Sequence, residues 1–184
     1  MSLPKRISDV VLNAYKRKKR ASADLSLAHC LRVARRIASR TKYAHLITTA
    51  SGGVPSGSAP SARLVQPIVA ADDFEFFIGT DPKSRKVAEI TAHPAVTLAF
   101  NQSDEDASLV VYGTATVHHE PDFKEEYWKS TWRLFFPEGP QSDNYVVVRV
   151  RAERMELLSF QRNVIPEPFG LRPVVLVRGE EGWH

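Results

Sequence analysis

Apolar side chains recur at helical spacing in the first 42 residues. Two successive stretches are apolar at every third or fourth position, and residues at that spacing share one face of a helix. The first stripe consists of Ile7, Val10, Val11 and Ala14, and the second of Leu27, Ala28, Leu31, Ala34 and Ala38. Asp24 is the expected N-cap of the second helix. The sequence therefore predicts two amphipathic helices before residue 43.

From Tyr43 onward the pattern changes to short alternating runs between turn signals, which is typical of strands. The predicted strands cover residues 43–49, 54–65, 74–78, 95–100, 109–117, 145–150, 155–160 and 174–177. We expect a glycine turn at 51–53 after the first strand, and Pro55 and Pro60 indicate that the second strand lies at an edge or bulge. Helices are expected over 82–92, with an Asp81 cap, and over 122–136.

Many short strands with few crossovers indicate the fold class and the domain organisation. Parallel units would need more connecting helices, so we predict an α+β fold, mainly antiparallel, around a small closed or partly closed β-barrel. We expect residues 1–42 to form a basic N-terminal helical segment and residues 43–184 to form the barrel domain. A length of 184 residues fits this organisation.

The net charge of +4 conceals two oppositely charged parts. Residues 1–42 hold twelve Lys or Arg against two Asp, whereas residues 43–184 hold thirteen against nineteen acidic residues. The basic helices suggest contact with nucleic acid or an anionic membrane surface. We favour the interpretation that the basic helices form a solvated face or cover the acidic barrel of a partner subunit. The reason is that the basic segment is covalently joined to an acidic domain.

Several classes of function are excluded by the sequence. It contains no Walker loop, no dinucleotide glycine fingerprint and no Gly-x-Ser-x-Gly elbow. His118 and His119 would face opposite sides of a strand, so we expect no metal site. Cys30 lies on the apolar stripe of the second helix and is expected to be buried and inert. The start has no signal-peptide stretch and no run is long enough to span a membrane, so a cytoplasmic protein is expected.

Residues 58–86 hold the strongest candidate for a binding site. Arg63 is a lone cation in a strand of small and apolar residues, and it must find an anion or solvent. About twenty residues later, Lys83, Arg85 and Lys86 crowd the predicted start of a helix, where cations oppose the helix dipole unless an anion is bound. A phosphate site and a solvated first turn both account for this spacing.

The order of five short motifs resembles the pyridoxamine 5'-phosphate oxidase-like FMN-binding split barrels. These motifs are Ser61-Ala62-Arg63-Leu64-Val65, Phe76-Phe77-Ile78-Gly79-Thr80, Ser84-Arg85-Lys86-Val87-Ala88-Glu89-Ile90, His93-Pro94 and Val96-Thr97-Leu98-Ala99-Phe100. An aromatic stretch with Trp128 and Trp132, followed by a Phe-Pro-x-Gly turn at 136–139, is most similar to the general stress protein branch. The resemblance covers about residues 40 to 160. It implies a homodimer with FMN at the subunit interface.

The resemblance also implies a set of cofactor-binding residues. Arg63 and Lys86 would hold the FMN phosphate, while Ser84 and Arg85 would add donors. Thr80 would lie near the ribityl chain or the phosphate. The backbone groups of Leu64 and Val65 would contact the isoalloxazine edge, and Phe77 and Ser108 complete the set. The full set is Arg63, Leu64, Val65, Phe77, Thr80, Ser84, Arg85, Lys86 and Ser108, the last at a position where the family often has glutamine.

Departures from the family pattern argue against pyridoxine phosphate as the substrate. Ile68 stands where true pyridoxamine phosphate oxidases carry a lysine, Leu158 replaces a tryptophan, and their substrate-phosphate motif is not recognisable. We therefore expect hydride or electron transfer through FMN to an unknown small molecule, with no side chain assigned as catalytic. A deazaflavin-dependent reductase and a non-catalytic flavin-binding stress protein are the alternatives. Trp128, Trp132 and Phe135 are expected to be core residues rather than a substrate wall.

Overall fold

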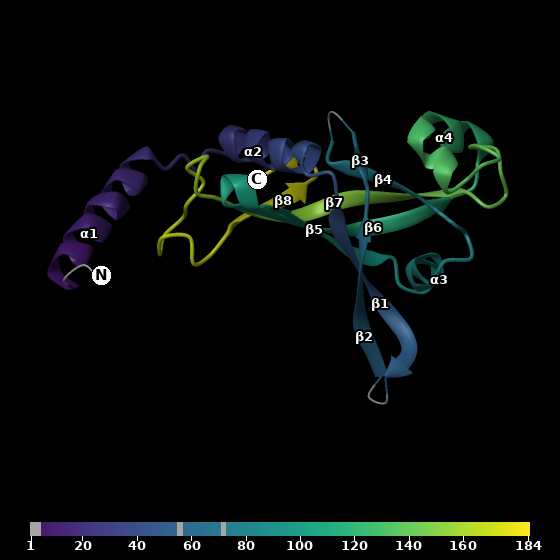
Figure 1. Cartoon of the computed structure of the whole chain (residues 1–184), viewed down its shortest axis with the longest axis horizontal. Helices are drawn as coiled ribbons and strands as arrows, with labels where there is room; N and C mark the ends of the chain where they lie inside the picture. The colour runs from purple at the N-terminus through teal and green to yellow at the C-terminus, as the bar shows by residue number, and fades with distance from the viewer. Residues whose placement is uncertain (1–4, 55–56, 71–72) are drawn as a thin grey trace.

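A single antiparallel sheet forms the body of the molecule in the computed structural model, which describes residues 5–54, 57–70 and 73–184 (Figure 1). The strands are β1 (Ala44–Val54), β2 (Gly57–Val65), β3 (Ile68–Val69), β4 (Glu75–Thr80), β5 (Ala95–Gln102), β6 (Ala107–His118), β7 (Val146–Ser159), β8 (Val174–Gly179) and β9 (Gly182–Trp183). Their order is β2-β1-β5-β6-β7-β4-β3, with β8 beside β7 and β9 beside β8. The predicted α+β, mainly antiparallel fold class is confirmed.

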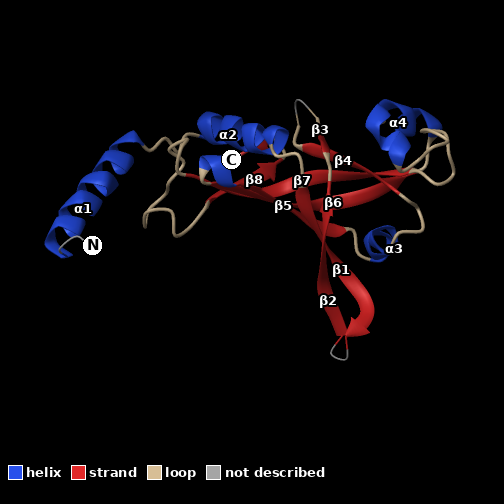
Figure 2. Cartoon of the chain, in the orientation of Figure 1, coloured by secondary structure: helices blue, strands red, loops and turns tan. Residues whose placement is uncertain are grey.

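Helices lie around this sheet (Figure 2). They are α1 (Lys5–Ser22), α2 (Leu27–Arg40), α3 (Arg85–Ala92), α4 (Pro121–Glu126) and the 3-10 helices η1 (Ser103–Glu105) and η2 (Ser130–Leu134). The apolar face of α2 and the face of α3 with Val87 and Ile90 belong to the main core, together with buried side chains of the sheet. A second apolar cluster around Trp132 and Tyr145 lies under α4 and η2. None of the described helices is long and apolar enough to cross a membrane.

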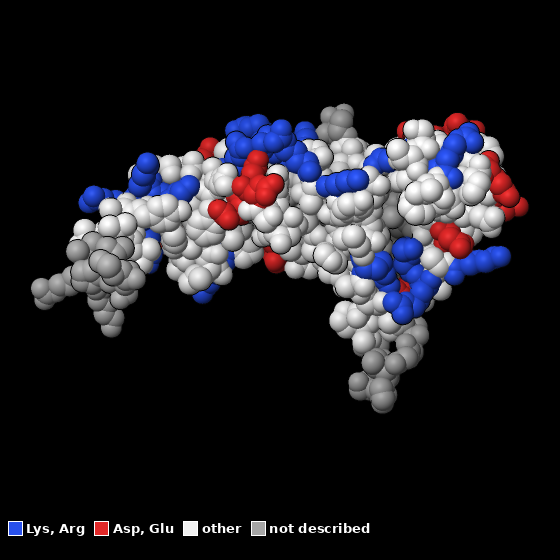
Figure 3. Space-filling view, viewed as in Figure 1, with Lys and Arg blue, Asp and Glu red and all other residues white. Residues whose placement is uncertain are grey.

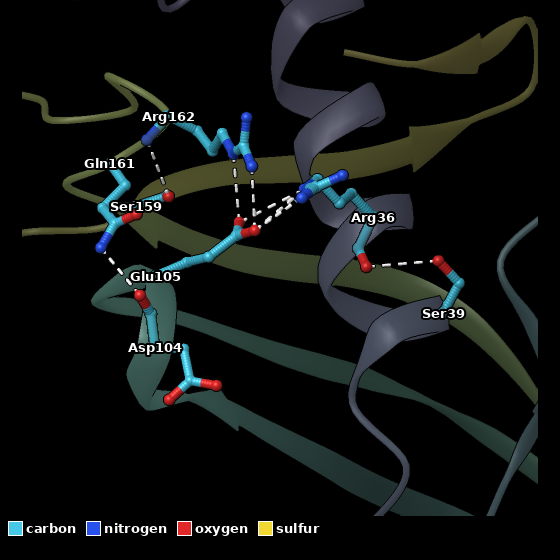
Figure 4. Close-up of polar contacts among 7 residues, drawn as sticks. All are labelled: Arg36, Ser39, Asp104, Glu105, Ser159, Gln161 and Arg162. Carbon is cyan, nitrogen blue, oxygen red and sulfur yellow. Dashed lines mark hydrogen bonds and ion pairs between the residues drawn. The ribbon is translucent and has the colours of Figure 1, made fainter.

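One buried carboxylate ties α2 to the sheet. Figure 4 shows Glu105, on η1 between β5 and β6, held between the guanidinium groups of Arg36 on α2 and Arg162 after β7. The Nη2 atoms of Arg36 and Arg162 lie 2.7 and 2.9 Å from Oε1 of Glu105. Their hydrogen bonds, that of Arg162 first, lower the pKa of Glu105 from 4.5 to about 2. Three distant parts of the chain therefore meet at one ion cluster.

The predicted cap positions were wrong at two helices. Ser26 and Ser84 are the N-caps of α2 and α3, in place of Asp24 and Asp81. Each aspartate accepts a hydrogen bond from a backbone N–H two residues on, of Ser26 at 2.9 Å and of Lys83 at 2.7 Å. Aspartate commonly closes such turns. The helices start after these turns rather than at them.

Two predicted segment boundaries also differ from the structure. The helix expected over 122–136 is divided into α4 and η2, because Trp128 leaves the helical path and packs edge-on against Tyr145, with ring centroids 5.0 Å apart. The strands expected at 145–150 and 155–160 form one strand, β7, because the alternation continues through Ala152, which is buried between exposed neighbours.

The turn of the first hairpin also differs from the prediction. β1 continues to Val54, beyond the expected glycine turn at 51–53, and its pairing with β2 is irregular between Ala50 and Val54. Pro55 lies outside the described residues. β2 is the last strand on its side of the sheet, and Pro60 pairs there with Thr49, as expected for an edge strand.

Candidate functional site

A cavity of about 400 Å³ opens where the end of β2, the end of β4 and the start of α3 meet η2. Its lining combines polar side chains with aromatic and aliphatic ones. The lining residues are Tyr43, Leu64, Val65, Gln66, Ile78, Gly79, Thr80, Asp81, Lys86, Trp132, Phe135 and Phe136. An apolar lining with a few polar groups is typical of ligand sites.

Lys86 is the half-buried cation of the cavity lining. Its Nζ donates a hydrogen bond to Oγ1 of Thr80 at 2.8 Å, and Thr80 lies 3.3 Å from the hydroxyl of Ser84. Burial, and then the nearby charge of Arg63, lower the pKa of Lys86. The first turn of α3 contains no acidic residue. A bound anion would stabilise the charge on Lys86 and would also accept hydrogen bonds from the helix start.

Arg63 lies beside the cavity and is bound by a carboxylate of the chain itself. It forms an ion pair with Glu89 of α3, whose side chain is only 5% exposed, and it donates further hydrogen bonds to Thr48 and Ser61. Burial alone would raise the pKa of Glu89, but hydrogen bonds from Thr48 and Arg63 lower it overall. Arg85 joins the same cluster through Ser61 at 3.0 Å. Glu89 is therefore ionised and partly neutralises the two arginines.

Lysines and arginines gather over this region on the surface. Figure 3 shows one group of basic side chains at α3 and a second over α2. The group at α3 contains Lys83, Arg85 and Lys86, of which Lys86 is half-buried and the other two are exposed. Basic side chains therefore gather beside the cavity, together with the exposed carboxylate of Asp81 in its lining, although residues 43–184 are acidic as a whole.

The structure brings most of the predicted site residues together. Four line the cavity, and three more lie next to it at the start of α3 or in the Glu89 cluster. Leu64, Val65, Thr80 and Lys86 belong to the first group, and Arg63, Ser84 and Arg85 to the second.

Two predicted site residues lie elsewhere within the chain. Phe77 is 1% exposed and stacks on Tyr127 in the second core cluster, with ring centroids 3.5 Å apart. Ser108 lines a different hollow, with Tyr15 and Leu158. The cofactor roles of all nine residues remain predictions.

Sequence reasoning missed Gly79 and Glu89. A Cβ added to Gly79 would lie 2.5 Å from Cζ3 of Trp132 and 2.7 Å from Cε2 of Tyr145, so only glycine lets the indole approach β4 and form the wall. No sequence signal indicated this contact. Glu89 did carry a signal, because a carboxylate four residues after Arg85 pairs with it on a helix, with Nε and Oε1 3.3 Å apart.

The three aromatic residues expected in the core have different environments. Trp128 packs against Trp132 and Tyr145 in the second cluster. Trp132 is only 6% exposed and also lines the cavity, while Phe135 is 70% exposed at its rim. The aromatic stretch therefore supplies both core and wall.

Cys30 and His118 have structural contacts within the chain. Cys30 is fully buried, and burial raises the pKa of its thiol. His118 stacks on Phe123 and pairs with the neighbouring Glu120 at 3.2 Å. Among the described residues, no group of three or more potential ligands is placed to hold a metal ion.

The antiparallel fold, with a basic corner and aromatic side chains beside its cavity, is that of a class of small split-barrel proteins. The family described as pyridoxamine 5'-phosphate oxidase like matches residues 39–163, and the chain belongs to this family. The family resemblance predicted from the motifs is thereby confirmed. No curated protein sequence matches the chain.

Solved structures of bacterial proteins share the fold. A protein related to general stress protein 26 from Clostridium acetobutylicum has a TM-score of 0.64 and 17% identity, covering 80% of this chain and 93% of its own. A pyridoxamine 5'-phosphate oxidase-related, FMN-binding protein from Nostoc punctiforme has a TM-score of 0.59 and 17% identity, covering 86% and 92%. General stress protein 26 from Bacillus anthracis has a TM-score of 0.55 and 16% identity, covering 70% and 93%.

Proposed function

We propose that this protein binds FMN in the cavity between β4, α3 and η2 and acts as a flavin-dependent oxidoreductase on a small molecule. The observation that carries the proposal is that one cavity is lined both by a half-buried lysine and by aromatic side chains. A phosphate-bearing, ring-containing ligand needs both. The FMN-binding relative with the same fold supports this choice of ligand.

The residues present fit the cofactor. Lys86, Thr80 and Ser84 would donate to the phosphate from the start of α3, and Arg63 and Arg85 would add positive charge from the Glu89 cluster. Trp132 and Phe135 would face the ring system. Bound FMN supplies hydride or electron transfer, and the protein supplies binding and orientation.

A homodimer accounts for the open side of the cavity. Leu64 and Phe135 line the cavity and are 58% and 70% exposed, and Leu134, which precedes Phe135 in the chain, is 80% exposed. Clustered apolar surface of this kind marks an interaction site. We infer that a second copy covers this side, so that FMN lies at the subunit interface.

The test is a fluorescence titration of the purified protein with FMN, riboflavin and FAD at fixed salt. Replacing Arg63 or Lys86 by Ala should weaken FMN binding by about 1.5 to 3 kcal/mol, the range of a charged hydrogen bond, and leave riboflavin binding nearly unchanged. Lys83→Ala is the matched control, because Lys83 is exposed and lies outside the cavity. If the wild-type protein does not bind FMN, the proposal is wrong. If Lys86→Ala protein binds FMN as tightly as wild type, the phosphate site has been assigned to the wrong residues.

A second measurement separates an enzyme from a flavin-binding stress protein. Anaerobic addition of NADH or NADPH should bleach the absorbance of bound FMN, and electron acceptors should restore it. Bound FMN that neither nucleotide reduces would favour the non-catalytic alternative. A deazaflavin that displaces FMN at lower concentration would favour the reductase alternative.

A further inference from the structure

One buried carboxylate, that of Glu89, pairs with both arginines beside the cavity. Its side chain is 5% exposed, and its Oε2 atom accepts hydrogen bonds from Thr48 and from Nη2 of Arg63. Its Oε1 atom lies 3.3 Å from Nε of Arg85. Both arginines of the proposed phosphate site are therefore already paired with an anion of the chain itself.

This pairing directs the donors of Arg63 toward the chain. Arg63 donates to Thr48 through Nη1 and to Ser61 and Glu89 through Nη2, with the Ser61 bond at 2.8 Å. These bonds use both protons of Nη2 and one of the two on Nη1, so few donors remain for a ligand. A phosphate in the cavity could bond fully to Arg63 only if the guanidinium gave up bonds to its own chain.

Stability alone does not account for a carboxylate in this position. Oε1 of Glu89 is buried and accepts no hydrogen bond from the described residues. Burial opposes the charged form of Glu89, and buried ion pairs often add little to stability because both charges lose water. The effect of Glu89 on the neighbouring cations is a better explanation for its presence.

The charge of Glu89 also acts on Lys86 in the cavity lining. Burial and then the charge of Arg63 lower the pKa of Lys86, whereas the charges of Asp81 and Glu89 oppose this shift. Asp81 is exposed, so solvent and salt screen its charge, but Glu89 is buried and is screened much less. Glu89 is therefore well placed to set how strongly an anion binds beside Lys86.

We propose that Glu89 is a positioning residue that competes with a bound phosphate for Arg63 and thereby limits the affinity of the site for phosphate-bearing ligands. As a ligand binds, Arg63 transfers hydrogen bonds from Glu89 to the phosphate, and the ion pair that is given up offsets part of the gain. This inference rests on the proposed phosphate site, but it does not depend on FMN being the ligand.

Replacing the carboxylate by an amide of the same shape tests the competition. Glu89→Gln protein should bind inorganic phosphate and FMN at least several-fold more tightly than wild type, because Arg63 then gives up no ion pair. Riboflavin, which has the same ring system without the phosphate, should bind equally to both proteins. Thermal unfolding at a series of phosphate concentrations and constant ionic strength measures phosphate affinity. Flavin fluorescence measures the other two.

Glu75→Gln is the matched control. Glu75 is also a partly buried carboxylate paired with an arginine, Arg149, and the two line a different hollow. This substitution changes the net charge by the same amount, so phosphate affinity should stay near the wild-type value. A similar gain in both variants would mean that overall charge controls binding, and it would overturn the proposal.

Arg63→Ala protein supplies a second test. Adding Glu89→Gln to it should raise phosphate affinity much less than in wild type, because no Arg63 is left to release. An equal gain with and without Arg63 overturns the competition. Unchanged or weaker phosphate binding by Glu89→Gln protein also overturns it, since Glu89 would then serve only to orient Arg63.

Thr48→Val decides the question if Glu89→Gln protein does not fold. It removes the hydroxyl that bonds to both Glu89 and Arg63, so Arg63 is held less firmly and phosphate should bind more tightly. No gain in this variant would overturn the proposal.

The outcomes also separate this inference from the proposed function. A gain in phosphate affinity in protein that does not bind FMN would support the competition and contradict only the choice of cofactor. FMN binding that does not tighten in Glu89→Gln protein would contradict only the competition.

Discussion

The positive charge beside the cavity depends on the pairing of a few individual residues. The sequence correctly indicated that Arg63 must find an anion, but the chain supplies one itself in Glu89. The expected cage of cations is therefore a cluster of two arginines and a carboxylate beside Lys86, whose described hydrogen bond goes to a neutral hydroxyl. Lys86 is the residue with most to gain from a bound phosphate.

The lowered pKa of Lys86 predicts a pH dependence of FMN binding. Burial makes Lys86 lose its proton at lower pH than an ordinary lysine, and phosphate prefers the protonated form. FMN affinity should therefore fall as pH rises, and the fall should begin at lower pH than for an ordinary lysine. Fluorescence titrations at a series of pH values measure it.

Arginine at the same position provides the control for this pH dependence. Lys86→Arg protein keeps its charge throughout the range, so its FMN affinity should stay level if the lysine is responsible. Equal slopes for both proteins would assign the titration to another group.

At the scale of elements, Gly79 sets the distance between β4 and η2. Gly79→Ala would push a methyl group into Trp132 and Tyr145, both buried, so we expect a loss of about 1 to 3 kcal/mol in the free energy of unfolding. Displacement of Trp132 should also weaken FMN binding by reshaping the wall. Urea unfolding followed by tryptophan fluorescence measures the loss.

Gly179→Ala is a matched control for this substitution. Its nearest neighbours would be ring atoms of His184, an exposed residue, rather than buried aromatic rings. A similar loss of stability in both variants would show that the close approach at Gly79 is unimportant.

Elements were predictable where the pattern along the chain decides them. Strand alternation follows directly from burial on one face and is found in the structure. The predicted stripe of α2 was only partly right, because Ala34 and Ala38 are buried but Leu27 and Ala28 are exposed, and the buried face includes Val33 and Ile37 instead. The division between α4 and η2 was not predictable, because it depends on Trp128 meeting Tyr145 from another part of the chain. Gly79 depends on a similar distant contact, whereas the basic start of α3 was visible in the sequence.

At the scale of the whole molecule, the two N-terminal helices differ in their relation to the barrel. The buried face of α2, with Val33, Ile37 and its neighbours, belongs to the same core cluster as the sheet. The described contacts of α1 are with the loop after β7, including Phe160 and Phe169. The predicted boundary at residue 42 remains a prediction, and we expect α2 to unfold together with the sheet.

The coupling of α2 to the sheet through Glu105 can be tested by unfolding at low pH. Because its folded pKa is lowered from 4.5 to about 2, its contribution to stability is complete above 4.5 and is lost as pH falls toward 2. Glu105→Gln should reduce the unfolding free energy at neutral pH by roughly 2 kcal/mol and flatten its fall in that window. Urea unfolding from pH 5 down to 2.5, followed by circular dichroism, measures both, with exposed Glu180→Gln as the control. Curves that stay parallel to wild type would mean that Glu105 does not hold α2 to the sheet.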